Sequence, residues 1–418
     1  MCRHVLIDVK NYLVLSLKHF YFPTNYEKSM KNCNKFSDFP YFFLIRNLSI
    51  LLLNHSPRFT SIIIFMLSKI ILALLVVSLA TANLHLNTKY RNVIFGSEQL
   101  TERVAQQMYL EFRSPHFERS DYRFQVFYET LKEIKQHNSG DHTWIQGIND
   151  FSDMTFEEFK QDKLMAPQNC SATSIFKVKE EKVKAAIPEN YEWNDFGMVS
   201  PVKNQGACGS CWTFSTVGAM ESHWNILGKG RNLTFSEQQL VDCADDFDNH
   251  GCNGGLPSHA FEYIKHVGGL ESDITYPYKA KTLPCVHRPE IAVAYCRHGS
   301  YNITQGDEKE LAERLYNAGP ISVSFQVITG FKNYAGGVYS VNNCGTGTQD
   351  VNHAVLATGY GVEKGMNFWN IKNSWGASWG ASGYFKMERD SNMCAIGQCN
   401  SYPLIDNIRD FEPIVSEQ

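Results

Sequence analysis

The clearest hydrophobic pattern in the chain follows the small and polar run Gln205–Ser210. After it, large apolar residues recur every three to five positions: Trp212, Val217, Met220, Trp224 and Leu227. This spacing predicts a helix that ends at Gly228 and buries those five side chains. Cys211 then lies in the first helical turn, where free N–H groups and the helix dipole favour an anion. We therefore expect Cys211 to have a depressed pKa and to act as a nucleophile.

Helical patterns dominate the chain up to about residue 300. Side chains three or four positions apart share one face of a helix, and such a series runs through Arg119, Arg123, Phe127, Thr130, Ile134 and Asn138. Ser236 is placed to cap a helix that runs to Cys243, and His259–Val267 is amphipathic.

Beyond residue 300 the pattern becomes that of strands. Ile321–Val327 alternates between apolar and polar residues, and β-rich segments surround His353, Trp369 and Tyr384. A helical half followed by a β-rich half predicts an α+β fold with two domains.

One apolar stretch has the parts of a secretory signal peptide. Met66–Ala82 has a short basic start, an apolar core and an Ala-x-Ala end, in the usual order. The alternative is a membrane anchor, because Ile62–Ala82 approaches the roughly 20 residues that span a bilayer, but Lys69 interrupts it. We expect Met66 to be the initiator, residues 1–65 to be an upstream extension of doubtful reality, and no stable membrane span.

Composition narrows the range of partners and compartments. A net charge of −4 argues against nucleic acid as a partner. Twelve cysteines, most of them in the second half of the chain, suggest an oxidising compartment. Three Asn-x-Ser/Thr triplets are candidate N-glycan sites, at Asn169, Asn232 and Asn302.

A nucleophilic thiol needs a proton acceptor, a group that orients the acceptor, and an oxyanion donor. His353, at the head of an apolar run, supplies the first, and Asn373 supplies the second. Trp375 lies two residues after Asn373 and is expected to shield a His–Asn hydrogen bond from water. Gln205 is close enough to the thiol in sequence to direct its amide at a developing oxyanion.

The Cys208-Gly-Ser-Cys211 motif also permits redox chemistry or zinc binding. A thioredoxin-type motif should follow a strand in a βαβ unit, and Gln205-Gly-Ala does not read as a strand. Zinc would need a second Cys/His pair at finger spacing, and none is placed convincingly. We therefore expect neither a metal nor a cofactor.

With its neighbours, this motif resembles the local signature of the papain family of cysteine proteases, Cys-Gly-[Ser/Ala]-Cys-[Trp/Tyr]. His353 falls within the expected spacing of roughly 130–150 residues after the thiol, and Asn373 a little beyond it. The resemblance runs from about Glu111 to Pro403. It implies a papain-like fold with a helical left domain and a β-barrel-like right domain, and places Cys211 and His353 on opposite walls of one cleft.

The same resemblance implies an inhibitory prodomain that lies through the cleft. The family's propeptide carries Glu, Arg, Phe, Asn, Ile and Asn at the spacing described above. This chain has Arg119 in place of the Glu and Thr130 in place of the first Asn. The run Gly147–Asp153 matches the second propeptide motif without a gap. We expect acid to release the prodomain by protonating carboxylates that pair with the enzyme, such as Asp153, Glu157 and Glu158.

Ala166-Pro-Gln-Asn-Cys-Ser-Ala-Thr173 resembles the mini-chain of the cathepsin H branch of the family, a propeptide remnant tethered by a disulfide. The branch has Glu where this chain has Ala166, and the other seven positions agree. The implied tether is Cys170–Cys399. A retained mini-chain would leave room for one residue before the scissile bond, so an aminopeptidase is expected.

The remaining roles are also implied by the resemblance. Gln205 and the Cys211 backbone N–H bind the oxyanion, Gly254 and Gly255 line the acyl side, and Trp379, near Trp375, flanks the leaving group. The framework disulfides are Cys208–Cys252, Cys243–Cys285 and Cys344–Cys394, while Cys296 is left as a buried thiol. Partners are peptide or protein substrates, the chain's own prodomain and cystatin-like inhibitors, in a lysosome or outside the cell.

These expectations divide the chain into consecutive segments: 1–65 extension, 66–82 signal peptide, 83–165 prodomain, 166–173 mini-chain, 174–186 linker removed on maturation, 187–300 helical half, 301–405 β-rich half and 406–418 tail. Three other functions stay open: a cathepsin L-like endopeptidase, an inactive binding homologue and a thiol oxidoreductase. The last would need Cys208 free.

Overall fold

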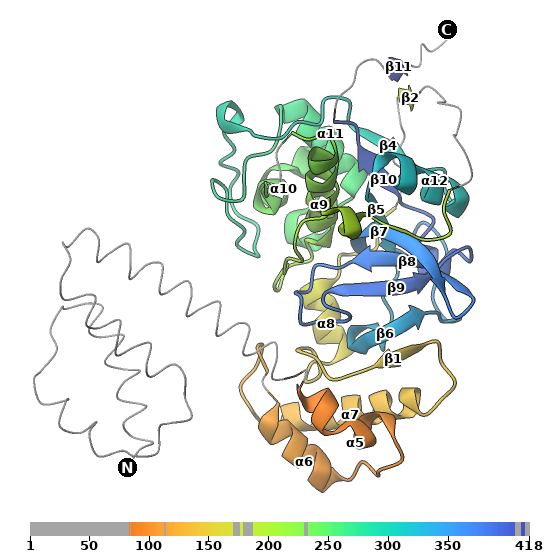
Figure 1. The fold of residues 1–418 in the computed structure, drawn as a ribbon. Coiled ribbons are helices and arrows are strands. Elements are labelled where there is room, and N and C mark those ends of the chain that lie inside the picture. Colours follow the sequence, from red (N-terminus) through yellow and green to blue (C-terminus); the bar gives the residue numbers. More distant parts are fainter. Residues whose placement is uncertain are drawn as a thin grey trace, which may run out of the picture. The chain divides into compact units, whose positions relative to one another are not determined.

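The structure is a computed structural model that describes residues 83, 85–112, 114–169, 176–178, 187–229, 233–405 and 411–413 (Figure 1). Every described residue lies in one compact unit, Val76–Gln418. The expected signal peptide and the extension before it lie outside the described residues.

The N-terminal segment, residues 85–165, starts with helices that form a core of their own: α5 (Arg91–Phe95), α6 (Glu102–Glu111) and α7 (Asp121–Asn138). The side chains of Thr101 and Ser120 cap the last two helices by accepting hydrogen bonds from backbone N–H groups of the first turn. The ring of Phe127 packs 5.4 Å from that of Tyr109 and 4.8 Å from that of Phe112. These contacts hold α6 and α7 together as a hairpin.

The expected shared helix face is wrong for Arg119. Helix α7 begins only at Asp121, so Arg119 lies before it. Its guanidinium instead donates to the carbonyl oxygens of Leu110 and Phe112, at 2.5 and 3.1 Å. A cation at the C-terminal end of α6 is favoured by the helix dipole, which accounts for an arginine at this position.

The N-terminal segment then runs onto the rest of the molecule. Strand β1 (Trp144–Gln146) pairs antiparallel with β6 (Tyr334–Tyr339). Helix α8 (Phe156–Lys163) follows and opens with a capping box, in which Thr155 and Glu158 each bond the other's backbone N–H. The segment is therefore attached to the β-rich half by main-chain hydrogen bonds.

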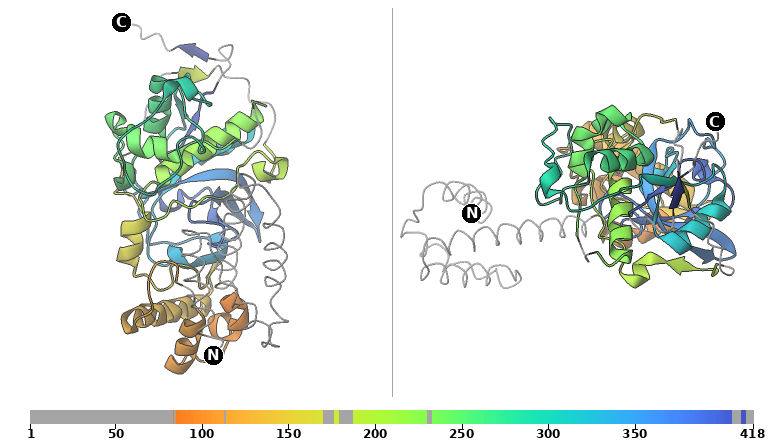
Figure 2. Two further views of the ribbon diagram at one scale, coloured as in Figure 1. Left: turned by 90° about the vertical axis from the view of Figure 1, so that its left-hand side faces the viewer. Right: turned by 90° about the horizontal axis from the view of Figure 1, so that it is seen from above.

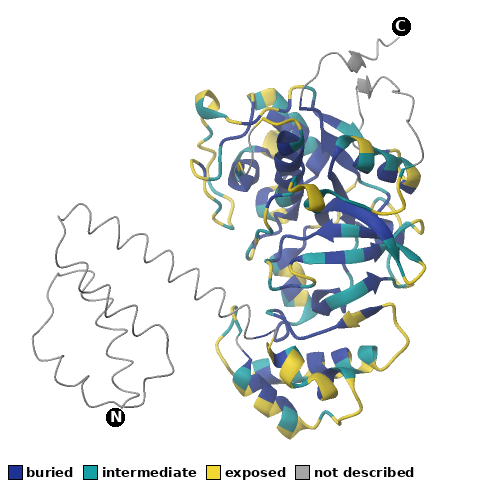
Figure 3. Ribbon diagram, in the orientation of Figure 1, coloured by how far each residue is buried: buried dark blue, intermediate teal, exposed yellow. Residues whose placement is uncertain are grey.

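The helical half is built around α9 (Cys211–Ile226), with α10 (Glu237–Cys243) and α11 (Pro257–Val267) beside it. The structure contains the helix that was expected after Cys211, but α9 is buried on nearly all sides (Figure 3). The expected burial of Leu227 is wrong, because α9 ends at Ile226 and the Leu227 side chain is 41% exposed. Ser236 caps α10 as expected, by accepting from Gln239 N.

The β-rich half contributes most of a nine-stranded sheet among the described residues, in the order β1-β6-β9-β8-β7-β5-β10-β4, with β3 paired to β7. Besides β1 and β6, the strands of this sheet are β3 (Tyr191–Glu192), β4 (Ser300–Asn302), β5 (Ile321–Phe325), β7 (His353–Glu363), β8 (Met366–Lys372), β9 (Tyr384–Glu388) and β10 (Ser401–Pro403). The β-rich segments expected around His353, Trp369 and Tyr384 are β7, β8 and β9.

Strand β5 does not have the one exposed face that its alternating sequence indicates. All five of its residues are buried. The hydroxyl of Ser322 hydrogen-bonds that of Ser215 on α9, which also donates to Val355 O at 2.6 Å. The polar face of β5 thus packs against a helix of the other half, and seen from above the helices of one half lie beside the strands of the other (Figure 2).

The chain crosses between the halves near both ends of the range 187–405. Tyr191 pairs with Tyr360 of β7, although it belongs to the first half in sequence. Leu404 N donates to Gly299 O at 2.9 Å, which brings the end of the second half back to the first. The two halves of the sequence, before and after residue 300, are therefore not fully separate in space, because each contributes residues to the other.

The remaining elements are short apart from α12 (Glu308–Ala318), which packs on β7. The 3₁₀ turns are η1 (Trp193–Phe196), η2 (Asp245–Phe247), η3 (Gly251–Asn253), η4 (Pro289–Ile291), η5 (Phe331–Asn333) and η6 (Met393–Ala395). A separate two-stranded ladder joins β2 (Phe176–Val178) and β11 (Phe411–Pro413).

Candidate active site

Cys211 is the first residue of α9 and is completely buried. Its Sγ accepts a hydrogen bond from the backbone N–H of Ala354 at 3.4 Å. Because Ala354 follows His353 in strand β7, this bond brings the thiol of the helical half next to the imidazole of the β-rich half.

His353 opens β7, opposite Phe325 of β5. Its Nε2 lies 2.8 Å from Asn373 Oδ1, while Nδ1 has no hydrogen-bond partner among the described residues. The Trp375 ring stacks on the imidazole with centroids 4.7 Å apart, and both side chains are buried. The structure therefore brings together the acceptor, the orienting amide and the shielding indole that the sequence indicated.

Gln205 is buried, and its side-chain amide is held by three hydrogen bonds to residues near Cys211 in sequence or space. The Nε2 group donates to Cys208 O at 2.8 Å and to Lys163 O of the N-terminal segment at 2.9 Å. Its Oε1 accepts from Ser374 Oγ at 2.7 Å, which ties Gln205 to the residue after Asn373. The amide expected to bind an oxyanion thus holds a carbonyl oxygen of the same chain.

The N-terminal segment crosses the site as an extended strand after α8. Its backbone bonds both walls: the amides of Met165, Ala166 and Gln168 donate to the carbonyl oxygens of Asn352 (3.0 Å), Asn253 (3.1 Å) and Val351 (3.2 Å). A side chain on Gly254 would meet Met165 Cβ at 2.7 Å and Gln168 Nε2 at 3.0 Å. Gly254 therefore lines the path of this strand, whereas a side chain on Gly255 would point at Asn249 and Trp212.

The expected low pKa of Cys211 is wrong for this occluded state. Burial raises the pKa of the thiol to about 11, and hydrogen bonds from backbone N–H groups offset only part of that rise. Burial also lowers the pKa of His353 to about 4, against the opposing effect of its bond to Asn373. Desolvation disfavours the charged form of each group, so the covered site holds a neutral thiol beside a neutral imidazole.

This arrangement has counterparts in known proteins. The family model described as "Papain family cysteine protease" matches residues 187–404. The chain belongs to the papain family of cysteine proteases. A second model, described as "Cathepsin propeptide inhibitor domain (I29)", matches residues 111–159. The papain-family peptidase thus carries an inhibitor domain of its own, consistent with intramolecular inhibition by the strand that covers Cys211.

Named relatives refine the assignment within the papain family. The peptidase is 46% identical over 356 residues to the thiol protease aleurain of Arabidopsis thaliana, covering 81% of this chain and 98% of the relative. It is 47% identical over 285 residues to pro-cathepsin H of Bos taurus, covering 68% and 84%. These relatives support a cathepsin H-like peptidase over the cathepsin L-like alternative.

Solved structures agree with the papain-like fold of the precursor. Procathepsin L2 from the larval midgut of Tenebrio molitor superposes with a TM-score of 0.63 at 34% identity, over 76% of this chain and 99% of that one. The expected α+β architecture with a helical propeptide is therefore confirmed.

Aromatic side chains of the propeptide pack on Trp375, next to His353. Phe151 and Phe159 pack edge-on against Trp375, with ring centroids 6.0 and 5.0 Å away. Trp379 packs on Trp375 at 4.8 Å, and its indole N–H donates to Lys332 O at 3.0 Å. Trp375, which was expected to shield the His–Asn hydrogen bond, and Trp379, which was expected to flank the leaving group, are both buried in the precursor.

Lys332 of the peptidase reaches into the propeptide, a contact that the sequence did not suggest. Its Nζ donates to Phe151 O and Met154 O at 3.1 and 2.8 Å, and lies 3.5 Å from Thr130 Oγ1. Burial lowers the pKa of Lys332 to about 8. Lysine on the peptidase and carbonyl oxygens on the propeptide thus form the polar centre of the contact.

Among the described residues, neither Glu158 nor Asp153, two of the expected acid-sensitive carboxylates, forms an ion pair with the peptidase. Glu158 forms two 2.7 Å bonds to Arg123 of the propeptide itself, which hold the pKa of its carboxyl at about 2. Asp153 is buried and burial raises its pKa. Protonation of Asp153 in acid therefore favours the buried state, which is opposite to the expected effect.

The cysteines form the three framework pairs that the resemblance implied, Cys208–Cys252, Cys243–Cys285 and Cys344–Cys394. Among the described cysteines, only Cys211 and Cys296 are free thiols, and both are buried. With Cys208 in a disulfide, the oxidoreductase alternative loses its second thiol. Cys399 is also disulfide-bonded, and the expected partner, Cys170, lies outside the described residues.

Other expected features can be located only in part. Asn169 is exposed and Asn302 is half-buried, while Asn232 lies outside the described residues. The part of the chain that the structure describes contains no cluster of three or more His, Cys, Asp or Glu side chains that could hold a metal ion. No helix within those same ranges is long and apolar enough to cross a membrane.

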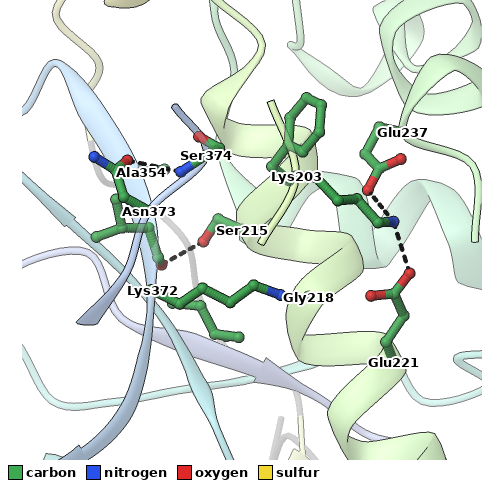
Figure 4. A pocket seen from close by; sticks show the side chains of 12 residues that line it. Lys203, Ser215, Gly218, Glu221, Glu237, Ala354, Lys372, Asn373 and Ser374 are labelled. Atoms are coloured by element: carbon green, nitrogen blue, oxygen red, sulfur yellow. Dashed lines mark hydrogen bonds and ion pairs between the residues drawn. The ribbon is translucent and has the colours of Figure 1, made fainter. Parts of the chain in front are cut away.

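The sequence also failed to suggest a buried group of charges behind the site, formed by Lys203, Glu221, Glu237 and Lys372 (Figure 4). A signal was present, because Lys372 directly precedes Asn373 and Glu221 interrupts the apolar stripe of α9. A charged residue inside an apolar helix is costly to bury unless it is paired.

Proposed function

We propose that Cys211, His353, Asn373 and Gln205 carry out peptide hydrolysis through an acyl-enzyme. The observation that supports this most is the contact between the two halves. The Cys211 thiol accepts from the residue after His353, and His353 is held by Asn373 at 2.8 Å.

In the mature peptidase, the Cys211 thiolate attacks the scissile carbonyl carbon and forms the C–S bond. Gln205 Nε2 and the Cys211 backbone N–H donate to the resulting oxyanion, in the place where Gln205 now holds Lys163 O. The C–N bond then breaks, and protonated His353 gives its proton to the leaving amine.

The second half of the cycle uses the same groups. His353, now neutral, takes a proton from water, whose oxygen attacks the thioester. Collapse of that intermediate releases the carboxylic acid, and the proton on His353 restores the ion pair with the Cys211 thiolate. Asn373 keeps the ring oriented through both steps, and Trp375 covers their hydrogen bond.

The Cys211→Ala variant tests these roles. We expect no peptidase activity above background, and a precursor that keeps its propeptide if maturation is autocatalytic. Cys296→Ala, which removes the other described free thiol, is the matched control and should stay active. Substantial activity in purified Cys211→Ala would refute the proposal.

The proposed specificity is that of an aminopeptidase. Ala166–Gln168 lie against Asn253 and Val351, on the side of the cleft that Gly254 lines and that would hold residues upstream of the cut. Cleavage after Thr173 would leave a carboxylate there, able to pair with a substrate's α-ammonium. Such a charge-assisted contact contributes roughly 1–3 kcal/mol.

Two measurements test the mini-chain together. Mass spectrometry of the mature enzyme should detect a Cys170–Cys399 peptide, and free amino-acid amides should be cleaved faster than their N-acetylated forms. Cys399→Ser should shift activity towards endopeptidase substrates. A preference for the blocked substrate, with the disulfide present, would favour a cathepsin L-like endopeptidase instead.

The proposal also covers the compartment of the enzyme, its partners and its processing. The relatives named aleurain and pro-cathepsin H support entry into the secretory pathway at Met66–Ala82, with a lysosomal or extracellular destination. Protein substrates and cystatin-like inhibitors would occupy the cleft that the propeptide vacates. This proposal includes segment boundaries at residues 83, 166, 174 and 187, which N-terminal sequencing tests. It also includes glycans at Asn169, Asn232 and Asn302, which deglycosylation tests.

A further inference from the structure

Three buried charged side chains, Glu221, Glu237 and Lys372, lie behind the proposed catalytic site with the partly buried Lys203, and the acyl-enzyme chemistry does not use them. Lys203 Nζ lies 2.8 Å from Glu221 Oε1 and 2.6 Å from Glu237 Oε1. Lys372 Nζ donates to Ser200 Oγ at 3.0 Å, and Ser200 Oγ in turn donates to the other oxygen of Glu221. We name these four charged residues and Ser200 the interior charge group.

The interior charge group connects the two halves of the peptidase. Glu221 belongs to α9, and Glu237 is the first residue of α10. Lys372 is the last residue of β8, and in Figure 4 its side chain extends from that strand towards α9. Lys203, Glu221, Glu237 and Lys372 line one cavity of about 20 Å³ together with Asn373.

Members of the group are also close in the chain to the proposed catalytic residues. Lys372 directly precedes Asn373, and α9 carries both Cys211 and Glu221. Lys203 lies two residues before Gln205. A shift of Lys372 relative to α9 would therefore move Asn373, and with it His353, relative to Cys211.

Burial makes this connection sensitive to the loss of any one charge. Glu221 and Glu237 are 1% and 2% exposed and Lys372 is 8% exposed. With all four charges present the group is neutral overall, whereas removing one leaves an uncompensated charge in the interior. Lys372 faces Ser200, Glu221, Lys203 and Glu237, and burial lowers its pKa to about 8.

We infer that Lys372 is a positioning residue: its ammonium anchors the end of β8 on Ser200 and α9 and so sets the angle at which Asn373 presents His353 to Cys211. The inference rests on the proposed function, because it assigns Lys372 to the geometry of that same site. A residue with this role affects the reactivity of the thiol without touching the substrate.

The test compares Lys372→Met with Lys386→Met in the mature enzyme. Lys386 of β9 forms a partly exposed ion pair with Glu363 at 2.6 Å and is not part of the interior charge group, so it is the matched control. We expect Lys372→Met to lower kcat per titrated active site by 10- to 100-fold at an unchanged KM. It should also slow iodoacetamide alkylation of Cys211 near pH 6 by at least 10-fold, and Lys386→Met should change neither.

Normalising to titrated active sites separates positioning from stability, since unfolded molecules are not counted. If Lys372→Met does not fold, Ser200→Ala removes only the bridging hydroxyl and should shift both rates in the same direction by at least threefold. Rates and alkylation profiles within twofold of the unmodified enzyme in either variant would overturn the inference. If Cys211→Ala were active, the proposed function would fail, whereas an inactive Cys211→Ala with a fully active Lys372→Met would refute only the role of Lys372.

Discussion

At the scale of single residues, burial affects the pKa of the Cys211 thiol more than the helix dipole does. A position at the start of a helix stabilises an anion by about 0.3–1 kcal/mol when exposed, whereas complete burial disfavours the thiolate by more. In the precursor the pKa of Cys211 is raised to about 11, with Met165 and its neighbours in place of solvent. The Cys211 thiol is thus kept protonated as well as covered.

This predicts a large difference in thiol reactivity between precursor and mature enzyme. At pH 7 a thiol of pKa about 11 is ionised in only about one molecule in 10⁴. We expect iodoacetamide to modify Cys211 at least 100-fold more slowly in the precursor, followed by mass spectrometry of the Cys211 peptide. A Cys296→Ser background removes the competing thiol, and equal rates in the two forms would contradict the prediction.

At the scale of elements, Glu158 links two propeptide helices. It completes the capping box of α8 and forms two bonds to Arg123 of α7. Its pKa is lowered to about 2, chiefly by Arg123. A depressed carboxyl pKa stabilises the fold above the unfolded value of 4.5, and that contribution is lost only as pH falls towards 2. The α7–α8 contact therefore persists at pH 5, the lower pH of the test below.

We predict that Glu158→Gln in a Cys211→Ala precursor lowers the stability of the α7–α8 contact by about 1.5–3 kcal/mol, the range for hydrogen bonds to charged groups. Hydrogen exchange of α8 amides should accelerate accordingly, and equally at pH 7 and pH 5. Glu157→Gln, one residue away and exposed, is the control and should leave exchange unchanged. An effect that disappears by pH 5 would show that Glu158 titrates in mild acid.

At the scale of the whole described molecule, the covered site itself makes the precursor acid-sensitive. Burial lowers the pKa of His353 to about 4, and that of the propeptide's His116, whose ring stacks on Phe151, also to about 4. Uncovered imidazoles titrate near 6.5. In a precursor without the Cys211 thiol, whose open state cannot form a thiolate–imidazolium pair, the open state binds protons between these values that the closed state excludes. The closed state of that variant is therefore favoured above pH 6.5 and weakens as pH falls towards 4.

For His353 the shift corresponds to roughly 3 kcal/mol, or about 10²-fold in the closed-to-open ratio. We predict that hydrogen exchange at β1 in the Cys211→Ala precursor rises steeply from pH 6.5 to pH 4. Adding His353→Gln should flatten that rise. An identical pH dependence in both variants would locate the acid response elsewhere.

The sequence by itself determined the local features of this protein. The apolar spacing after Cys211 specified α9, Ser236 specified the start of α10, and the order of Gln205, Cys211, His353 and Asn373 indicated one site. The first two depend on neighbours within a few turns of helix, and the third on short motifs that follow one another in a fixed order, so the sequence alone is enough to predict them.

Only the tertiary structure decided which of these groups are charged and what they touch. Strand β5 is buried on both faces because α9 covers its serines, and Glu158 bonds Arg123 instead of the enzyme. The neutral state of Cys211 and the link from Lys372 to α9 likewise arise from segments far apart in the chain. Burial and pairing are properties of contacts between distant segments, and sequence spacing does not contain them.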